Sequence, residues 1–77
     1  MTIKIKYFGL IAEVTNKTEE SIDFSANTID AILSLLYTKY PDLKNKDFQV
    51  AQNQELVSGN TKVTGEELAL LPPFSGG

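Results

Sequence analysis

Apolar and polar residues alternate along the first strand that the sequence predicts, at residues 2–8. Alternation with a period of two is typical of a strand that is buried on one face only. Phe8 interrupts it by placing an aromatic ring on the lysine face. The same pattern predicts a second, antiparallel strand at residues 21–24, because the connection between the two is short. The buried face of the first strand is expected to consist of Ile3, Ile5 and Tyr7.

A single long helix is predicted to begin after Thr28 and to end at Pro41. The Thr28 hydroxyl can cap the first turn, and Pro41 disfavours helical geometry in the residue before it. Leu35 lies off the apolar stripe and is expected to be partly exposed. Between the two strands and before this helix, one helical turn is expected around residues 11–14, with a turn at Asn16. The stripe itself consists of Ile29, Ile32, Leu33, Leu36, Tyr37 and Tyr40.

Three more strands are predicted in the second half of the chain. A third strand around Phe48 and Val50 follows a polar turn at residues 45–47 and leads into a hairpin tip at residues 53–54. A fourth strand covers residues 55–57, and a turn at residues 64–67 precedes the last strand at residues 68–71. The last strand is expected to point Leu68 and Leu70 inward and Ala69, Leu71 and Pro73 outward.

One helix can cover one face of one sheet, so the predicted fold is a two-layer α+β structure. The order of elements is that of the β-grasp, or ubiquitin-like, fold: a mixed sheet of about five strands with one main helix packed on one face. Its first and last strands usually lie parallel at the centre of the sheet. We therefore expect Phe8, Leu71 and Pro73 to be neighbours on the open face, where they would form a docking patch beside the C-terminus.

The last residues have the features of a functional tail. Pro72 and Pro73 restrict the backbone, so the stem should project from the domain. Phe74 can anchor a tail in a partner's pocket, and Gly76 and Gly77 can pass through a channel too narrow for side chains. Fully extended, the tail reaches about 13 Å beyond Pro73. We expect a β-grasp domain at residues 1–73 and a flexible tail at residues 74–77.

Composition excludes most catalytic chemistry. The 77 residues form one domain and contain neither cysteine nor histidine, so the usual nucleophile, general base and metal ligands are missing. The net charge of −3 and the absence of arginine argue against nucleic acid as a partner. No apolar run is long enough to span a membrane, and a cytoplasmic location is expected. The pairs Glu19–Glu20 and Glu66–Glu67 are interpreted as solvated surface.

The carboxylate of Gly77 is then the remaining reactive group. With an ordinary pKa of about 3.5 it is ionised at neutral pH and is a poor electrophile. It needs activation, most simply as a mixed anhydride with AMP made from ATP by another protein. The activated carboxyl could accept an amine, giving a conjugate, or sulfur, giving a thiocarboxylate.

The ending from Leu71 to Gly77 resembles that of the small subunit of molybdopterin synthase, the MoaD-type sulfur carriers. The resemblance covers the whole chain. Departures occur at Ala12, where the family often has arginine, at Asn16, where it often has glycine, and at Thr64, where it often has an acidic residue. The matching segments are Tyr7-Phe8-Gly9, Glu13, the Thr28-led helix, Asn53-Gln54, Gly65-Glu66-Glu67 and the Pro-Pro-x-x-Gly-Gly ending.

The resemblance implies a carrier that is not an enzyme on its own and binds no cofactor or metal. An adenylylating enzyme (MoeB-type, related to ubiquitin-activating enzymes) would activate Gly77 with ATP and magnesium, and a sulfur donor would form the thiocarboxylate. The tail would enter the large synthase subunit (MoaE-type), in a heterotetramer, and deliver sulfur to a cyclic pyranopterin. Gly77 would carry the sulfur and Gly76 would permit entry. The partner would be held by Phe8, Leu71, Pro72, Pro73, Phe74 and Ser75.

Three other functions are compatible with the same residues. A thiamine-type sulfur carrier shares the fold and the Gly-Gly end, but generally lacks the Pro-Pro-Phe stem. A ubiquitin-like modifier would use the same tail chemistry to reach protein lysines. A binding module with an inert tail would need no activation at all.

Overall fold

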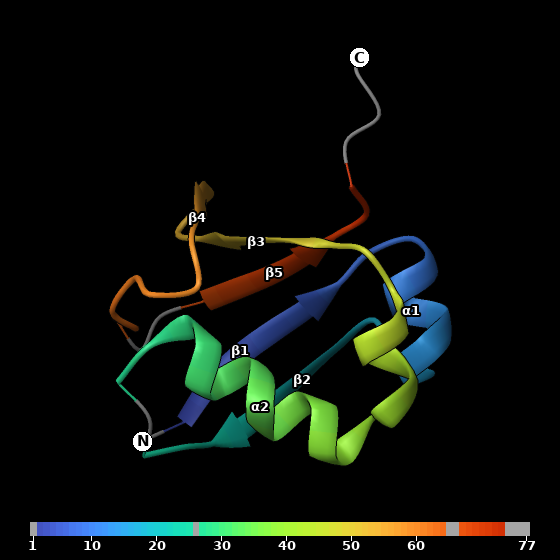
Figure 1. Ribbon diagram of the computed structural model, residues 1–77, viewed down its shortest axis with the longest axis horizontal. Coiled ribbons are helices and arrows are strands. Elements are labelled where there is room, and N and C mark those ends of the chain that lie inside the picture. Colours follow the sequence, from blue (N-terminus) through green and yellow to red (C-terminus); the bar gives the residue numbers. More distant parts are fainter. Residues whose placement is uncertain (1, 26, 65–66, 74–77) are drawn as a thin grey trace.

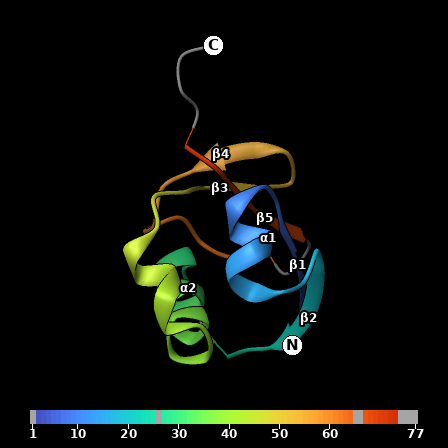
Figure 2. The same ribbon diagram turned by 90° about the vertical axis from the view of Figure 1, so that its right-hand side faces the viewer.

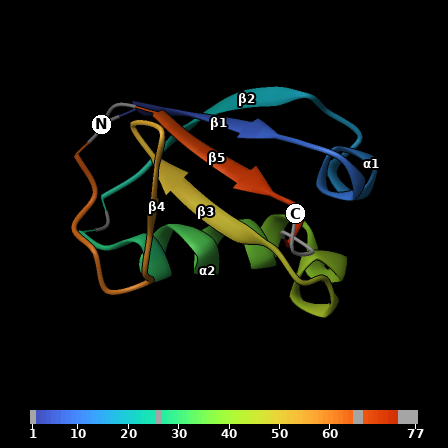
Figure 3. The same ribbon diagram turned by 90° about the horizontal axis from the view of Figure 1, so that it is seen from above.

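The computed structural model describes residues 2–25, 27–64 and 67–73. The described strands form one mixed sheet in the order β2-β1-β5-β3-β4, which Figure 3 shows from above. Strands β1 and β5 run parallel at its centre, and the other neighbours are antiparallel. The elements are β1 (Thr2–Tyr7), α1 (Leu10–Thr15), β2 (Glu19–Asp23), α2 (Ile29–Lys39), a 3-10 helix η1 (Pro41–Asn45), β3 (Gln49–Gln52), β4 (Glu55–Val57) and β5 (Glu67–Leu71).

Helix α2 packs its apolar stripe against one face of the sheet, while α1 lies at the end of the sheet where β1 stops (Figures 1 and 2). The predicted β-grasp fold is confirmed. Leu35 is 45% exposed, as its place off the stripe predicts. Most of the predicted inward positions are buried in one core, and the others, Leu33, Tyr37, Tyr40 and Phe48, are partly buried against it. The buried positions are Ile3, Ile5, Tyr7, Ile29, Ile32, Leu36, Val50, Leu68 and Leu70.

The ends of α2 follow the predicted signals. The Thr28 hydroxyl accepts a hydrogen bond from the Ala31 N–H at 3.3 Å, and the helix stops one residue before Tyr40. Pro41 then opens η1, which places Leu43 fully in the core. The sequence pattern predicted no element at Leu43. A lone apolar residue among polar ones carries no periodic signal, so its burial depends on the tertiary fold.

The turns agree with the residue types found in them. Asn16 ends α1 with φ of 63°, in the left-handed region that asparagine tolerates. Asn53 and Gln54 have φ of 53° and 70°, so positive values occupy both central positions of the β3–β4 hairpin. Such turns match the right-handed twist of the strands they join. The predicted hairpin tip is therefore confirmed, and α1 extends the single turn expected around residues 11–14 to six residues.

Candidate functional site

The root of the tail is fixed by the two central strands. In the parallel pair, Tyr7 lies opposite Leu70, and the N–H of Phe8 donates to the Leu70 carbonyl at 3.1 Å. Both strands end at the same end of the sheet (Figure 1). Pro72 therefore lies beside Gly9, the residue that connects β1 to α1. The stem therefore leaves the domain from the two central strands of the sheet.

Both the backbone conformation at residue 9 and the closeness of Pro72 require a glycine at this position. Its φ is +57° with ψ of −133°, a conformation that residues with a Cβ rarely adopt. A Cβ built on Gly9 would lie 2.7 Å from Cγ of Pro72. The bare backbone of Gly9 thus lets the first proline of the stem pack against the start of α1.

Gly9→Ala is expected to lower the free energy of unfolding by about 2 kcal/mol, because the new methyl group adds backbone strain and a contact with Pro72. Urea denaturation of both proteins measures the difference. Leu10→Ala is the matched control, since Leu10 is 61% exposed and its truncation should change stability by less than about 0.5 kcal/mol. Equal stability of Gly9→Ala and the parent would show that Pro72 is free to move away.

An apolar hollow of about 320 Å³ lies on the open face of the sheet, away from α2. Phe8, at 43% exposure, and the half-buried Leu71 share this hollow, as the strand pattern predicted. The ion pair between Lys6 Nζ and a Glu67 carboxylate oxygen, 3.5 Å long, connects two more of its lining residues. We call this surface, lined by Lys6, Phe8, Ala51, Gln54, Glu67, Ala69 and Leu71, the open-face hollow.

Pro73 was expected beside Phe8 and Leu71 but lines a different cavity. Together with Pro72 it borders a second hollow of about 200 Å³, whose other lining residues are Leu10, Ile11, Lys46 and Asp47. The alternation of faces ends with β5 at Leu71, so it no longer fixes where Pro73 points. Contact of Pro72 with Gly9 brings the stem toward α1.

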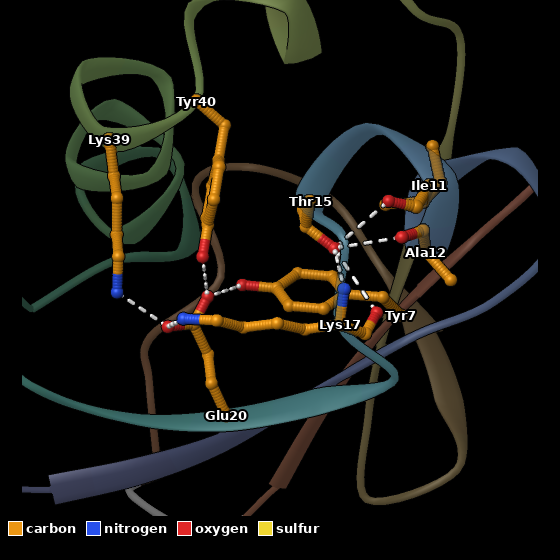
Figure 4. Close-up of polar contacts among 8 residues, drawn as sticks. All are labelled: Tyr7, Ile11, Ala12, Thr15, Lys17, Glu20, Lys39 and Tyr40. Carbon is orange, nitrogen blue, oxygen red and sulfur yellow. Dashed lines mark hydrogen bonds and ion pairs between the residues drawn. The ribbon is translucent and has the colours of Figure 1, made fainter.

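A buried carboxylate holds the end of β1 to α2. Glu20 on β2 accepts hydrogen bonds from the hydroxyls of Tyr7, at 2.6 Å, and Tyr40, at 2.5 Å (Figure 4). Lys39 and Lys17 pair with its other oxygen at 2.5 and 3.3 Å. The side chain of Glu20 is only 8% exposed. The interpretation of Glu19–Glu20 as solvated surface is therefore wrong for Glu20.

The donors around Glu20 determine its charge. Burial alone would raise the pKa of this carboxyl, but the hydrogen bonds from Lys39, Tyr40, Tyr7 and Lys17 together lower the pKa to about 2. Burial, and then the hydrogen bond to Glu20, raise the pKa of Tyr7 far above its ordinary value. Glu20 is thus an anion and Tyr7 a neutral donor throughout the neutral range.

The lowered pKa of Glu20 predicts acid sensitivity. Its contribution to stability is present above the ordinary pKa of 4.5 and is lost as the pH falls from 4.5 toward 2. Glu20→Gln should lower the free energy of unfolding at pH 7 by about 2 kcal/mol, since it leaves buried donors poorly paired. Thermal melting between pH 2 and pH 7 tests this. Glu20→Gln should flatten the profile, whereas Glu19→Gln, at the exposed Lys4–Glu19 pair, should not. Identical profiles for the parent and Glu20→Gln would contradict this role.

The sequence model of the ThiS family matches residues 5–77 of this chain. The chain belongs to the ThiS family. Relatives named molybdopterin synthase sulfur carrier subunit are similar over the whole chain, with 34% identity in Chlamydomonas reinhardtii, covering 100% of that protein, and 32% in Caenorhabditis elegans, covering 99% of it. The predicted relationship to molybdopterin synthase small subunits is confirmed.

Solved structures share the fold of this chain. A putative molybdopterin converting factor subunit 1 from Pyrococcus furiosus has the same fold, with a TM-score of 0.88 at 17% identity, covering 96% of this chain and 99% of that one. SAMP1 from Haloferax volcanii gives a TM-score of 0.82 at 26% identity over both full chains. A chain in the complex of molybdopterin-converting factor subunits 1 and 2 from Helicobacter pylori gives a TM-score of 0.68 at 25% identity, also over both full chains.

The tail residues predicted for this ThiS-family chain, Phe74, Ser75, Gly76 and Gly77, lie outside the described residues, as do Gly65 and Glu66 of the predicted turn. Among the described residues, no cluster of acidic side chains could hold a metal ion. No helix in the described part of the chain is long and apolar enough to cross a membrane.

Leu56, at 63%, and Leu10, at 61%, are the most exposed large apolar residues in the described part of the chain, and the sequence pattern assigned neither of them a function. Leu56 lies in β4 opposite Ala51, which lines the open-face hollow. The sequence could have predicted this exposure. Successive residues in a strand face opposite sides, so if Val57 faces the core, its neighbour Leu56 must face outward.

Proposed function

We propose that this chain is the sulfur-carrying small subunit of molybdopterin synthase. One observation supports this most directly: the stem of the Gly-Gly tail is rooted at the central strand pair, next to an exposed apolar hollow. A tail placed there can enter a partner that covers the hollow. The full-length similarity to proteins named molybdopterin synthase sulfur carrier subunit supports the same function.

The proposed chemistry takes place on Gly77. Its carboxylate oxygen attacks the α-phosphorus of ATP in the activating enzyme, with magnesium, and pyrophosphate leaves. A sulfide sulfur then attacks the carbonyl carbon of the adenylate and displaces AMP. The resulting thiocarboxylate carries one sulfur atom in place of one oxygen. Sulfur is transferred to a cyclic pyranopterin in the large subunit, and water restores the carboxylate.

The open face gives the large subunit a surface to bind. Phe8 and Leu71 would lie at the centre of the contact, with Lys6 and Glu67 at its polar rim, the arrangement usual for protein interfaces. Pro72 and Pro73 would direct the tail, and Phe74 and Ser75 would line its path. The complex of subunits 1 and 2 from Helicobacter pylori supports a partner of this kind, and we propose a heterotetramer of two small and two large subunits.

An intact-mass spectrum tests the carrier function. The purified chain is incubated with the activating enzyme, ATP, magnesium and a sulfide source, and its mass is compared with that of a sample lacking ATP. The expected result is a species heavier by one exchange of oxygen for sulfur, located at Gly77 by fragmentation. An unchanged mass under loading conditions, with an enzyme that loads a known carrier, would leave only a binding module.

A protein modifier is the second candidate, and the similarity to SAMP1 from Haloferax volcanii favours it, because related structures are named small archaeal modifier protein 1. In this function a lysine amine, instead of sulfur, would displace AMP from Gly77 and form an isopeptide bond. Recovery of the chain from its host distinguishes the two. A Gly77 thiocarboxylate supports the carrier, whereas Gly-Gly remnants on lysines of other proteins support the modifier.

A further inference from the structure

A groove of about 650 Å³ lies between α2 and the β3–β4 hairpin, separate from the open-face hollow. Tyr37 of α2 and Phe48, just before β3, both line it and contact each other, with ring centroids 6.4 Å apart. The loop after β4 lines the groove and is joined to the first turn of α2, because the Asp30 N–H donates to the Gly59 carbonyl at 2.8 Å. The apolar lining residues are Ile29, Leu33, Tyr37, Phe48, Val50, Leu56 and Val57.

One wall of the groove is an edge strand. Among the described strands, β4 pairs with β3 alone and ends the sheet, beside the start of α2 (Figures 1 and 3). Gln52 and Glu55 flank a two-residue turn and therefore form a hydrogen-bonded pair. Along an antiparallel ladder, hydrogen-bonded pairs alternate with pairs that are not hydrogen-bonded to each other. The Ala51–Leu56 pair is consequently not hydrogen-bonded. The N–H and C=O of Leu56 therefore point outward, where another strand can pair with them.

The charged groups of the groove favour a cationic ligand. Asp30 and Asp47 line it together with one cation, Lys46. The carboxylate of Asp30 is held against Gly59, where an added Cβ would lie 2.1 Å from its Oδ1. Any side chain at residue 59 would displace this carboxylate, so glycine is needed there to keep it in place. Asp47 is exposed and has no ion pair among the described residues.

We propose that this groove binds an extended segment of a partner protein, which adds to β4 as a strand. The segment pairs its backbone with Leu56, places alternate apolar side chains over Tyr37, Phe48 and Val57, and brings a lysine or arginine to Asp30 and Asp47. Main-chain pairing of this kind supplies affinity, while side-chain pockets supply specificity. The inference does not depend on the proposed sulfur chemistry, since it uses neither the tail nor Phe8.

The test uses a synthetic peptide of about eight residues, long enough for one strand. It alternates valine and threonine between terminal lysines, and one matched peptide has terminal glutamates. Titration into the 15N-labelled full chain is followed by NMR. The lysine peptide should shift the amide resonances of β4 and α2 saturably and slow hydrogen exchange at Leu56. The glutamate peptide should bind about fivefold more weakly.

Two protein variants separate backbone pairing from side-chain contact. Leu56→Pro removes only an outward N–H, so the β3–β4 ladder should persist and binding should fall about tenfold. Leu56→Ala keeps the N–H and should bind more tightly than Leu56→Pro. Asp47→Lys should reverse the preference between the two peptides. If Leu56→Pro unfolds, a lysine peptide N-methylated at its central valine makes the same test on the parent.

Several results would overturn the proposal. One is the absence of saturable shifts at millimolar peptide, and another is that the shifts are confined to Phe8 and Leu71. A third is that Leu56→Pro binds the lysine peptide as tightly as the parent does, or that the parent binds the N-methylated peptide as tightly as the unmodified one. Sedimentation velocity adds one more. A concentration-dependent dimer that protects the Leu56 amide without peptide would assign the groove to a second copy of the chain.

Discussion

Adding one alanine after Gly77 is expected to reduce sulfur loading at least about a hundredfold, because activation requires the carboxylate to be aligned with the α-phosphorus of ATP. An extra residue moves the reacting group by about 3.5 Å, and its Cβ must enter a path proposed to admit only glycine. Binding of the activating enzyme to the domain should persist, because the added residue changes no residue of the domain. The measurement is the fraction of chain that gains the mass of one oxygen-to-sulfur exchange in a fixed time.

The matched control carries the same alanine before Met1, so its mass equals that of the extended chain. It should load like the parent, and both variants should melt at the parent's temperature, since neither addition replaces a residue of the core. Normal loading of the chain extended after Gly77 would refute the carrier function. Loss of loading in both variants would instead indicate damage to the domain.

The sequence predicted the fold because local and tertiary signals agree in most elements. Alternation identified the inward faces of β1 and β5, and Leu68 and Leu70 are fully buried as expected. The capping residue Thr28 and the stop at Pro41 set the ends of α2 within one residue. Once the β-grasp topology was assigned, the position of Phe8 beside Leu71 followed from the parallel pairing of the first and last strands.

The features that the sequence analysis missed depend on contacts between distant residues. Glu20 looked solvated because its partners Lys39 and Tyr40 lie 19 and 20 residues away and meet it only when α2 packs on the sheet. Leu43 has no periodic neighbours that reveal its burial. Pro73 lies beyond the end of β5, where no regular alternation determines its direction.

Phe8→Asp is expected to weaken binding to the large synthase subunit about a hundredfold or more, while the melting temperature stays nearly unchanged. Phe8 is 43% exposed and follows the last residue of β1, so the isolated domain loses little packing when it is replaced. In the proposed complex its ring would be buried, and a carboxylate there would be desolvated without a partner. Titration calorimetry with the large subunit measures the affinity.

Leu35→Asp is the matched control, because Leu35 is 45% exposed but lies on α2, outside the open-face hollow. It should bind the large subunit as tightly as the parent. Equal weakening by both substitutions would mean that added charge, and not the position of Phe8, governs binding. A large fall in the melting temperature of Phe8→Asp alone would assign the ring to the core, and the proposed docking surface would then have to be sought around Leu71 and the prolines that follow it.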